Sequence, residues 1–335
     1  MTLLPRPNPR VLVAIAAGVG VLATSACGSS DQEPSASSSE TTIVTGFYPL
    51  EFIATRVAGD LATVDTLTAP GAEPHDVELS PQAVGSVGTA DLVLYSADLQ
   101  AAGDDAVEQQ GGDHTLDVNE AADLISTGAE HEHEGEHEHE GEHEHEGEHE
   151  HEGEHEHEGA DTSLDPHFWL DPARMGSVTD LVAERLVEMD PDHATTYQSN
   201  ADALVAELED LDAAYRDGLA SCEQEQMVTT HEAFGYLALN YGFDQVGIAG
   251  ISPEAEPSPA RLAEVATLVR ETGVDTIYSE VLVGADIAET VATETGAEVL
   301  VLDPVEGLTE ESAGQDYLEV MRSNLDTLRT GQQCS

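Results

Sequence analysis

Short apolar runs alternate with segments of helical periodicity along most of the chain. Strands buried in a parallel sheet are apolar runs of about four to eight residues, whereas helices repeat apolar residues three and four positions apart. The alternation predicts an α/β fold of mostly parallel sheets flanked by helices. The predicted strands cover residues 43–50, 64–67, 91–95, 227–231, 245–248, 276–279 and 299–302. The predicted helices cover residues 51–59, 81–89, 173–189, 192–219, 232–241, 259–271, 285–295 and 315–329.

One predicted helix, residues 192–219, is unusually long. Its apolar stripe consists of Leu204, Leu208, Leu211 and Tyr215. A helix of roughly 25 residues, at 1.5 Å per residue, is nearly 40 Å long, enough to run from one lobe into another. A chain of 335 residues has room for two lobes. We therefore expect an N-terminal lobe at 42–190, a linking helix at 191–219 and a C-terminal lobe at 220–335.

Residues 130–159 interrupt this pattern with a repeat of six residues, Glu-His-Glu-His-Glu-Gly, that holds ten of the chain's fifteen histidines. The repeat contains no apolar residue, so it cannot form a core, and we expect a disordered loop within the N-terminal lobe. Regularly spaced imidazoles and carboxylates favour weak, multivalent binding of metals such as zinc. The alternative is an acidic low-complexity linker.

Negative charge extends beyond this tract. The formal charge is -58; the tract contains fifteen glutamates and no basic residue, which leaves 53 acids against ten arginines, or -43, elsewhere. The chain has no lysine. Such a composition argues against nucleic acid and anionic substrates and suits cations, although a high-salt habitat explains it equally well. The chain also lacks the glycine-rich lysine motif that binds nucleotide phosphates.

The N-terminus has the layout of a secretory signal: Arg6 and Arg10 precede an apolar run at 11–23. Small residues then lead to Cys27, which resembles a bacterial lipoprotein cleavage site even though Thr24 stands where Leu is usual. We expect a signal peptide at 1–26, lipidation of Cys27 and a flexible tether at 27–41. An ordinary secretory signal and an uncleaved anchor are the alternatives.

Two further cysteines, Cys222 and Cys334, form an even pair in a chain that is expected to be exported. A disulfide between them is therefore reasonable, with free thiols as the alternative.

Five histidines lie outside the tract. Of these, His75, His167 and His231 occur in loops or at a strand end, in three segments far apart in the sequence. Zinc takes about four ligands in a tetrahedron, so three imidazoles and one acid would suffice. Spacing alone does not link the three, and each could be a surface or core histidine. His114 and His193 are assigned no role.

Four segments link these histidines by resemblance: residues 71–76 (Gly-Ala-Glu-Pro-His-Asp), 165–172 (Asp-Pro-His-Phe-Trp-Leu-Asp-Pro), 230–236 and 251–258. They resemble, in order, the signature segments of the metal-specific solute-binding proteins of ABC transporters (cluster A-I), and the histidine-rich insertion before the second is typical of the zinc-uptake branch. The resemblance implies two α/β lobes joined by one rigid helix, with the metal in the cleft between them. The implied ligands are His75, His167, His231 and Glu306, with Asp303 as second choice for the acid.

The resemblance also implies a function: a monomeric, lipid-anchored receptor on the outer face of the cell membrane that captures Zn²⁺. It would deliver the ion to a membrane permease driven by a separate ATPase, without catalysis. A manganese or iron receptor is the nearest alternative. A zinc hydrolase, suggested by Glu232 beside His231, and a metal-buffering adhesin based on the tract are alternatives from other classes.

Overall fold

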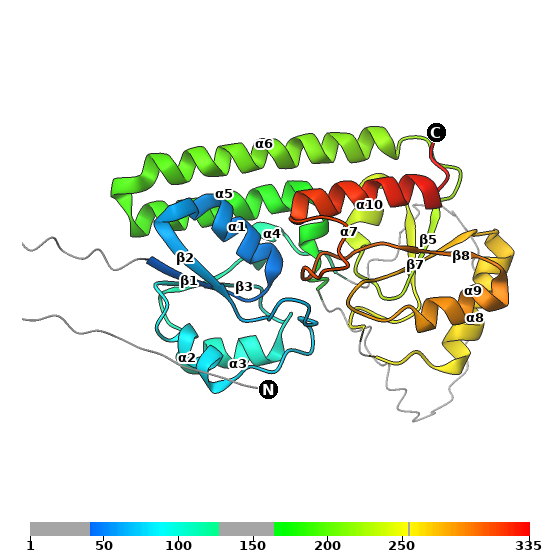
Figure 1. Ribbon diagram of the computed structural model, residues 1–335, viewed down its shortest axis with the longest axis horizontal. Helices are drawn as coiled ribbons and strands as arrows, with labels where there is room; N and C mark the ends of the chain where they lie inside the picture. Colours follow the sequence, from blue (N-terminus) through cyan, green and yellow to red (C-terminus); the bar gives the residue numbers. More distant parts are fainter. Residues whose placement is uncertain (1–40, 127–163, 254) are drawn as a thin grey trace, which may run out of the picture. The chain divides into compact units, whose positions relative to one another are not determined.

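The structure is a computed structural model that describes residues 41–126, 164–253 and 255–335 (Figure 1). All of these belong to one compact unit, Glu40–Ser335. The expected signal peptide, Cys27, most of the tether and the whole histidine tract lie outside the described residues. None of the described helices combines the length and the apolar character needed to cross a bilayer.

The first sheet has four parallel strands in the order β2-β1-β3-β4. Its central strand β1 is buried on both faces, as the apolar run at Ile43 and Val44 predicts. A small cluster around Val44 packs with α2 and α3, and Ile43 belongs to the main core on the other face. The strands are β1 Thr41–Thr45, β2 Ala62–Thr66, β3 Leu92–Tyr95 and β4 Thr115–Asp117, and the helices are α1 Tyr48–Ala58, α2 Pro81–Val87, α3 Ala101–Gln110 and α4 Asn119–Ala122.

The second sheet repeats this topology, with four parallel strands in the order β6-β5-β7-β8. Val228 and Ile277 on its central strands pack against α8 and α9. Parallel strands place their carboxyl ends along the same edge of a sheet, where α/β proteins hold ligands. The strands are β5 Gln226–Thr229, β6 Asp244–Gly247, β7 Thr276–Ser279 and β8 Glu298–Val301, and the helices are α7 Gly235–Tyr241, α8 Pro259–Thr272, α9 Asp286–Thr295 and α10 Tyr317–Gly331.

Two long helices, α5 (Pro172–Met189) and α6 (Ala194–Gly218), pack along each other (Figure 1). Helix α6 has 25 residues and contacts both α1 of the first half and α10 of the second. Its predicted apolar stripe is buried, and the Tyr215 hydroxyl donates a hydrogen bond to the Met321 carbonyl at 2.6 Å. The long helix therefore joins the two halves, and the predicted fold class is confirmed.

Hydrogen bonds also connect the two halves near the second sequence motif. The Trp169 indole donates to the Pro304 carbonyl at 2.7 Å, and the Tyr317 hydroxyl donates to the Trp169 carbonyl at 2.5 Å. Tyr236, on α7, donates to the Asp165 carbonyl at 2.6 Å. One hydrophobic cluster runs through both halves, from β1 to α10. The motif that contains His167 is thus bonded to helices α7 and α10 and to the loop after β8, all in the second half.

The end of the chain is tied back to the start of the second half. A disulfide joins Cys222 to Cys334 across 112 residues. The Gln332 side chain reinforces this join by donating to the carbonyls of Gln224 and Gln226, both at 3.1 Å.

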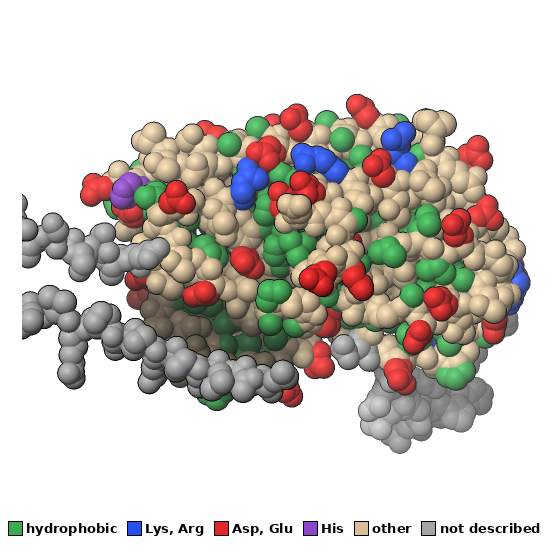
Figure 2. Space-filling view, in the orientation of Figure 1, with side chains coloured by type: hydrophobic (Ala, Val, Ile, Leu, Met, Phe, Trp, Pro, Cys, Tyr) green, Lys and Arg blue, Asp and Glu red, His purple; other side chains and the backbone are tan. Residues whose placement is uncertain are grey.

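The surface reflects the composition. Figure 2 shows acidic side chains spread over one face, with few basic ones among them.

Two local differences from the predicted elements have physical reasons. Helix α3 was not predicted, because its sequence contains glycine and several acids and only two of its residues are buried. Helix α1 begins at Tyr48 rather than at residue 51, because Pro49 occupies the first turn, where a missing N–H costs nothing.

Candidate metal centre

His75 lies on the long loop between β2 and α2. Gly71 adopts a positive φ of 77°, which lets the chain turn back within a segment rich in proline. The His75 backbone N–H donates to Glu73 Oε1 at 3.1 Å, and the His75 side chain is 8% exposed. The loop thus directs this imidazole inward.

His167 lies shortly after the histidine-rich insertion. Leu164, three residues before it, pairs with Ser126 in an isolated β-bridge. Asp165 Oδ1 accepts two bonds from it, one from its backbone N–H at 2.9 Å and one from ring atom Nδ1 at 2.8 Å. A carboxylate on Nδ1 fixes the tautomer and leaves Nε2 as the free ligand atom. The ring is fully buried.

His231 stands just beyond the carboxyl end of β5, and Glu280 just beyond the neighbouring strand β7. Glu280 Oε2 lies 2.7 Å from His231 Nδ1, and Oε1 accepts from the His231 backbone N–H at 3.2 Å and from the Thr230 hydroxyl. Neighbouring parallel strands bring these two residues together. The two fully buried imidazoles, His167 and His231, therefore each have a carboxylate beside Nδ1.

Glu306, after β8, completes the group. Its Oε1 lies 3.6, 3.3 and 3.4 Å from Nε2 of His75, His167 and His231, respectively. Nε2 of His75 is 3.1 Å from Nε2 of His167. Within the described residues these four side chains form the one group that could hold a metal, with ligand atoms within 4.8 Å of one another.

These separations fit zinc. Ligands at about 2.0–2.1 Å from a tetrahedral zinc ion are separated by about 3.3–3.4 Å. The observed distances of 3.1 to 3.6 Å fall on either side of that value. Four of the six separations among these atoms thus have the length of an edge of a zinc tetrahedron, and all four atoms lie within 4.8 Å of one another.

The sequence matches a known family over most of its length: the family model described as "Zinc-uptake complex component A periplasmic", ZnuA, matches residues 43–331. The chain belongs to this family. The high-affinity zinc uptake system protein ZnuA of Bacillus subtilis is 36% identical over 314 residues, which cover 92% of this chain and 93% of that protein.

Other ZnuA-like proteins extend the comparison. The zinc-binding lipoprotein AdcA of Streptococcus pneumoniae is 38% identical over 290 residues, 86% of this chain but 55% of AdcA, so this chain spans about half of that relative. The crystal structure of the Zn(II)-bound ZnuA-like domain of the S. pneumoniae protein has a TM-score of 0.68 and 33% identity, and the match covers 88% of this chain and 99% of that domain. Together with the three histidines and one glutamate, this supports zinc as the bound ion.

In the ZnuA-like site of this chain, burial and hydrogen bonds act on the ligand candidates in opposite directions. Burial lowers the pKa of His231, but hydrogen bonds with Glu280 and Glu306 outweigh it and raise that pKa to about 10. Burial lowers the pKa of His167 as well, and its hydrogen bonds with Asp165 and Glu306 produce a net increase. Without metal, the His231 imidazole holds a proton at neutral pH.

The pKa values of Glu306, His75 and Glu73 are also shifted by their surroundings. Burial raises the pKa of Glu306, yet hydrogen bonds from the three imidazoles hold it well below its usual range. The pKa of His75 is lowered, chiefly by burial. Burial, together with the charge on Glu306, raises the pKa of Glu73 to about 8. Glu73 is therefore neutral at pH 7, and Glu306 is the carboxylate that carries charge among the imidazoles.

The other candidates lie elsewhere. His114 contacts the Val87 carbonyl at 2.9 Å, and exposed His193 pairs with Asp190 at 2.6 Å. Asp303 and Glu232 are not members of the four-residue group.

Sequence reasoning assigned no role to Asp165 or Glu280. Asp165 begins the motif at 165–172, two residues before His167. Glu280 could have been found as the acid that follows the strand Thr276–Ser279, since ligand sites gather at strand ends. No sequence pattern states that β7 lies beside β5.

Proposed function

We propose that this chain is an extracytoplasmic receptor that captures Zn²⁺ through His75, His167, His231 and Glu306 and delivers it to a membrane permease. The observation that carries the proposal is the set of ligand-atom separations of 3.1 to 3.6 Å. They match four of the six edges of a zinc tetrahedron, and the family to which the chain belongs is a component of zinc-uptake complexes.

The donor set favours holding the ion over reacting with it. Three neutral imidazoles and one carboxylate fill all four positions of tetrahedral zinc, whereas catalytic sites keep one position open for water. The site therefore supports a binding protein and not an enzyme.

The same donor set separates zinc from its competitors. Imidazole-rich tetrahedral sites suit zinc, whereas manganese and magnesium favour oxygen ligands in octahedral geometry. Metal content after purification from medium with equimolar zinc and manganese tests this choice. If the purified protein retains manganese, it is a manganese receptor and the zinc proposal is wrong.

The proposal includes the location of the protein. A signal peptide at 1–26 would export the protein, and a lipidated Cys27 would anchor a monomer to the outer face of the membrane. The tether at 27–41 would then precede, in the sequence, the N-terminal lobe at 42–190, the linking helix at 191–219 and the C-terminal lobe at 220–335. The name of the relative AdcA, a zinc-binding lipoprotein, supports the anchor. Metabolic labelling with a fatty acid, compared between the wild-type protein and Cys27→Ala, tests it.

The histidine tract at 130–159 has an auxiliary role in this proposal, as a set of weak sites that raise the local zinc concentration. Titration of a tract-deleted protein should show one tight zinc site. If tight binding disappears with the tract, the metal-buffer alternative is correct.

The ligand set is tested in the same tract-deleted background. Loss of a residue that only supports a metal ligand weakens metal binding about ten- to hundredfold. His167→Ala removes a proposed ligand itself and should therefore weaken zinc binding about 100-fold or more. His193→Ala is the matched control, because His193 also pairs with an aspartate but lies at the surface. Equal affinities of the two variants would refute the site.

A further inference from the structure

The segment that presents Glu306 has an unusual backbone. Val305, immediately before it, has a φ of 58°, in the left-handed region, and its side chain is fully buried. For a β-branched residue this conformation is a true outlier, and it persists only where the surroundings enforce it. The residue before a candidate ligand is therefore held in a conformation that the chain would not choose by itself.

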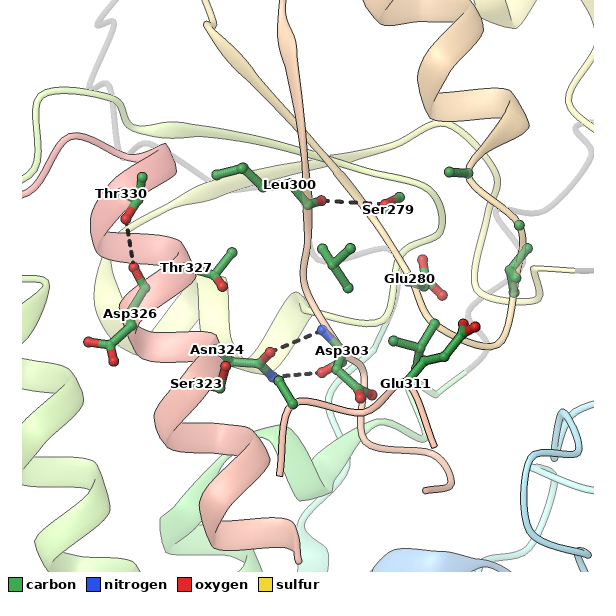
Figure 3. Close-up of a pocket in the computed structure, with 16 residues that line it drawn as sticks. Ser279, Glu280, Leu300, Asp303, Glu311, Ser323, Asn324, Asp326, Thr327 and Thr330 are labelled. Carbon is green, nitrogen blue, oxygen red and sulfur yellow. Dashed lines mark hydrogen bonds between the residues drawn. The ribbon is translucent and has the colours of Figure 1, made fainter. Parts of the chain in front are cut away.

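Three side chains enforce this turn. Asp303 Oδ1 accepts a hydrogen bond from the Val305 backbone N–H at 2.8 Å. The Asn324 side chain, on α10, accepts from the Asp303 N–H at 3.0 Å and donates to the Asp303 carbonyl at 2.6 Å (Figure 3). The Trp169 indole holds the intervening Pro304 carbonyl at 2.7 Å.

Asp303 lies close to the four-residue group without joining it. It is 3% exposed and lines, with Glu280, a pocket of about 690 Å³ beside α10 (Figure 3). Its Oδ1 is occupied by the Val305 N–H, and proline at 304 has no N–H to offer in its place. The side chain therefore closes a short turn over Pro304, a role that aspartate and asparagine fill well.

We propose that Asp303 is a positioning residue: by capping the left-handed turn at Val305, it fixes Glu306 as the carboxylate ligand, while Asn324 holds Asp303 in place. The inference rests on the proposed ligand set. A change of φ at Val305 to a negative value redirects the chain that follows and carries the Glu306 carboxylate away from the three imidazoles. Asp303 thus acts through Glu306 and does not contact the ion.

Two substitutions at one position separate capping from charge or ligation. Asp303→Asn keeps an oxygen for the Val305 N–H and should bind zinc within about threefold of wild type. Asp303→Ala removes the cap and should weaken binding about ten- to hundredfold, as loss of an outer-shell partner does. Asn324→Ala should weaken zinc binding in the same direction. The affinities are measured by competition with a zinc-chelating dye in the tract-deleted protein.

A double-mutant cycle tests whether Asp303 acts through Glu306. In a Glu306→Ala background, Asp303→Ala should cause no further loss of affinity, because the group that it positions is gone. Asn200→Ala is the stability control, since it removes a side-chain bond to the Val57 carbonyl at 2.9 Å far from the ligands. It should lower the melting temperature without changing zinc affinity.

The outcomes that overturn the inference are distinct. Equal losses in Asp303→Asn and Asp303→Ala would show that the charge matters and not the cap. Independent, multiplying losses from Asp303→Ala and Glu306→Ala would show direct ligation or a general electrostatic effect. If Glu306→Ala alone leaves zinc affinity unchanged, the proposed ligand set fails, and the inference fails with it.

Discussion

Asp165→Ala should weaken zinc binding although Asp165 is not a proposed ligand. Its Oδ1 accepts bonds from both the backbone N–H and Nδ1 of His167, at 2.9 and 2.8 Å. Without the carboxylate, the buried imidazole loses the partner that selects its tautomer and raises its basicity. Outer-shell partners of this kind contribute about ten- to hundredfold to metal affinity, or about 1.4–2.7 kcal/mol.

The assay is a zinc competition titration at pH 7 on the tract-deleted protein. Asp165→Asn should lose less affinity than Asp165→Ala, because an amide oxygen still accepts both bonds but carries no charge. Asp190→Ala is the matched control: it removes a similar aspartate–histidine contact, of 2.6 Å to His193, at the surface. Wild-type affinity in Asp165→Ala would refute the positioning argument.

Three further predictions follow from the same structure. Although burial lowers the pKa of His231, hydrogen bonds with two glutamates raise it to about 10, so zinc must displace a proton. Zinc affinity should therefore rise about tenfold per pH unit between about pH 6 and pH 8, and calorimetry in buffers of different ionisation enthalpy should count the proton. The raised pKa of His231 stabilises the metal-free protein fully below about pH 6.5, and this stability is lost as pH rises toward about 10. The increase in melting temperature caused by zinc should therefore grow with pH. An increase that stays constant with pH would contradict the assignment. Reduction of the Cys222–Cys334 disulfide, which closes 112 residues, should lower the free energy of unfolding by about 2–5 kcal/mol and leave zinc stoichiometry unchanged, as melting with and without reductant would show. Gly235→Ala would place a Cβ 2.7 Å from Asp165 Oδ2 and should weaken zinc binding several-fold in the same titration; an unchanged affinity would show that Asp165 can shift without cost.

Much of the fold could be predicted from periodicity. Strands such as β1 and β7 are buried on both faces, so their apolar residues are adjacent and do not alternate with exposed polar ones, as in Ile43-Val44 and Ile277-Tyr278. The stripe on α6 is visible because a helix that packs on several neighbours must be apolar along one face. Helix α3 escaped prediction because it buries little and so has little pattern.

The site divides in a similar way. The sequence shows His75, His167 and His231 as candidate ligands, because they lie in loops or at a strand end. Only the family resemblance linked the three, because their proximity depends on which strands are neighbours. Glu280 reaches His231 through the pairing of β5 with β7, which no local sequence pattern records. The φ of Val305 is the extreme case: valine disfavours this conformation, and tertiary contacts impose it.

The shared core has a consequence for modularity. One hydrophobic cluster includes Ile43 in the first sheet, Tyr215 on α6 and Leu328 on α10. The main hydrophobic core is therefore shared between the two halves. Two-lobed proteins with separate cores can unfold in steps, whereas a shared core couples the lobes into one cooperative unit. Either lobe expressed alone would expose the apolar surface that the other covers. A hybrid receptor made by exchanging whole lobes would therefore need its α6 and α10 contacts rebuilt. Exchange of the ligand loops would disturb the same core, because Trp169 and Val305 belong to it.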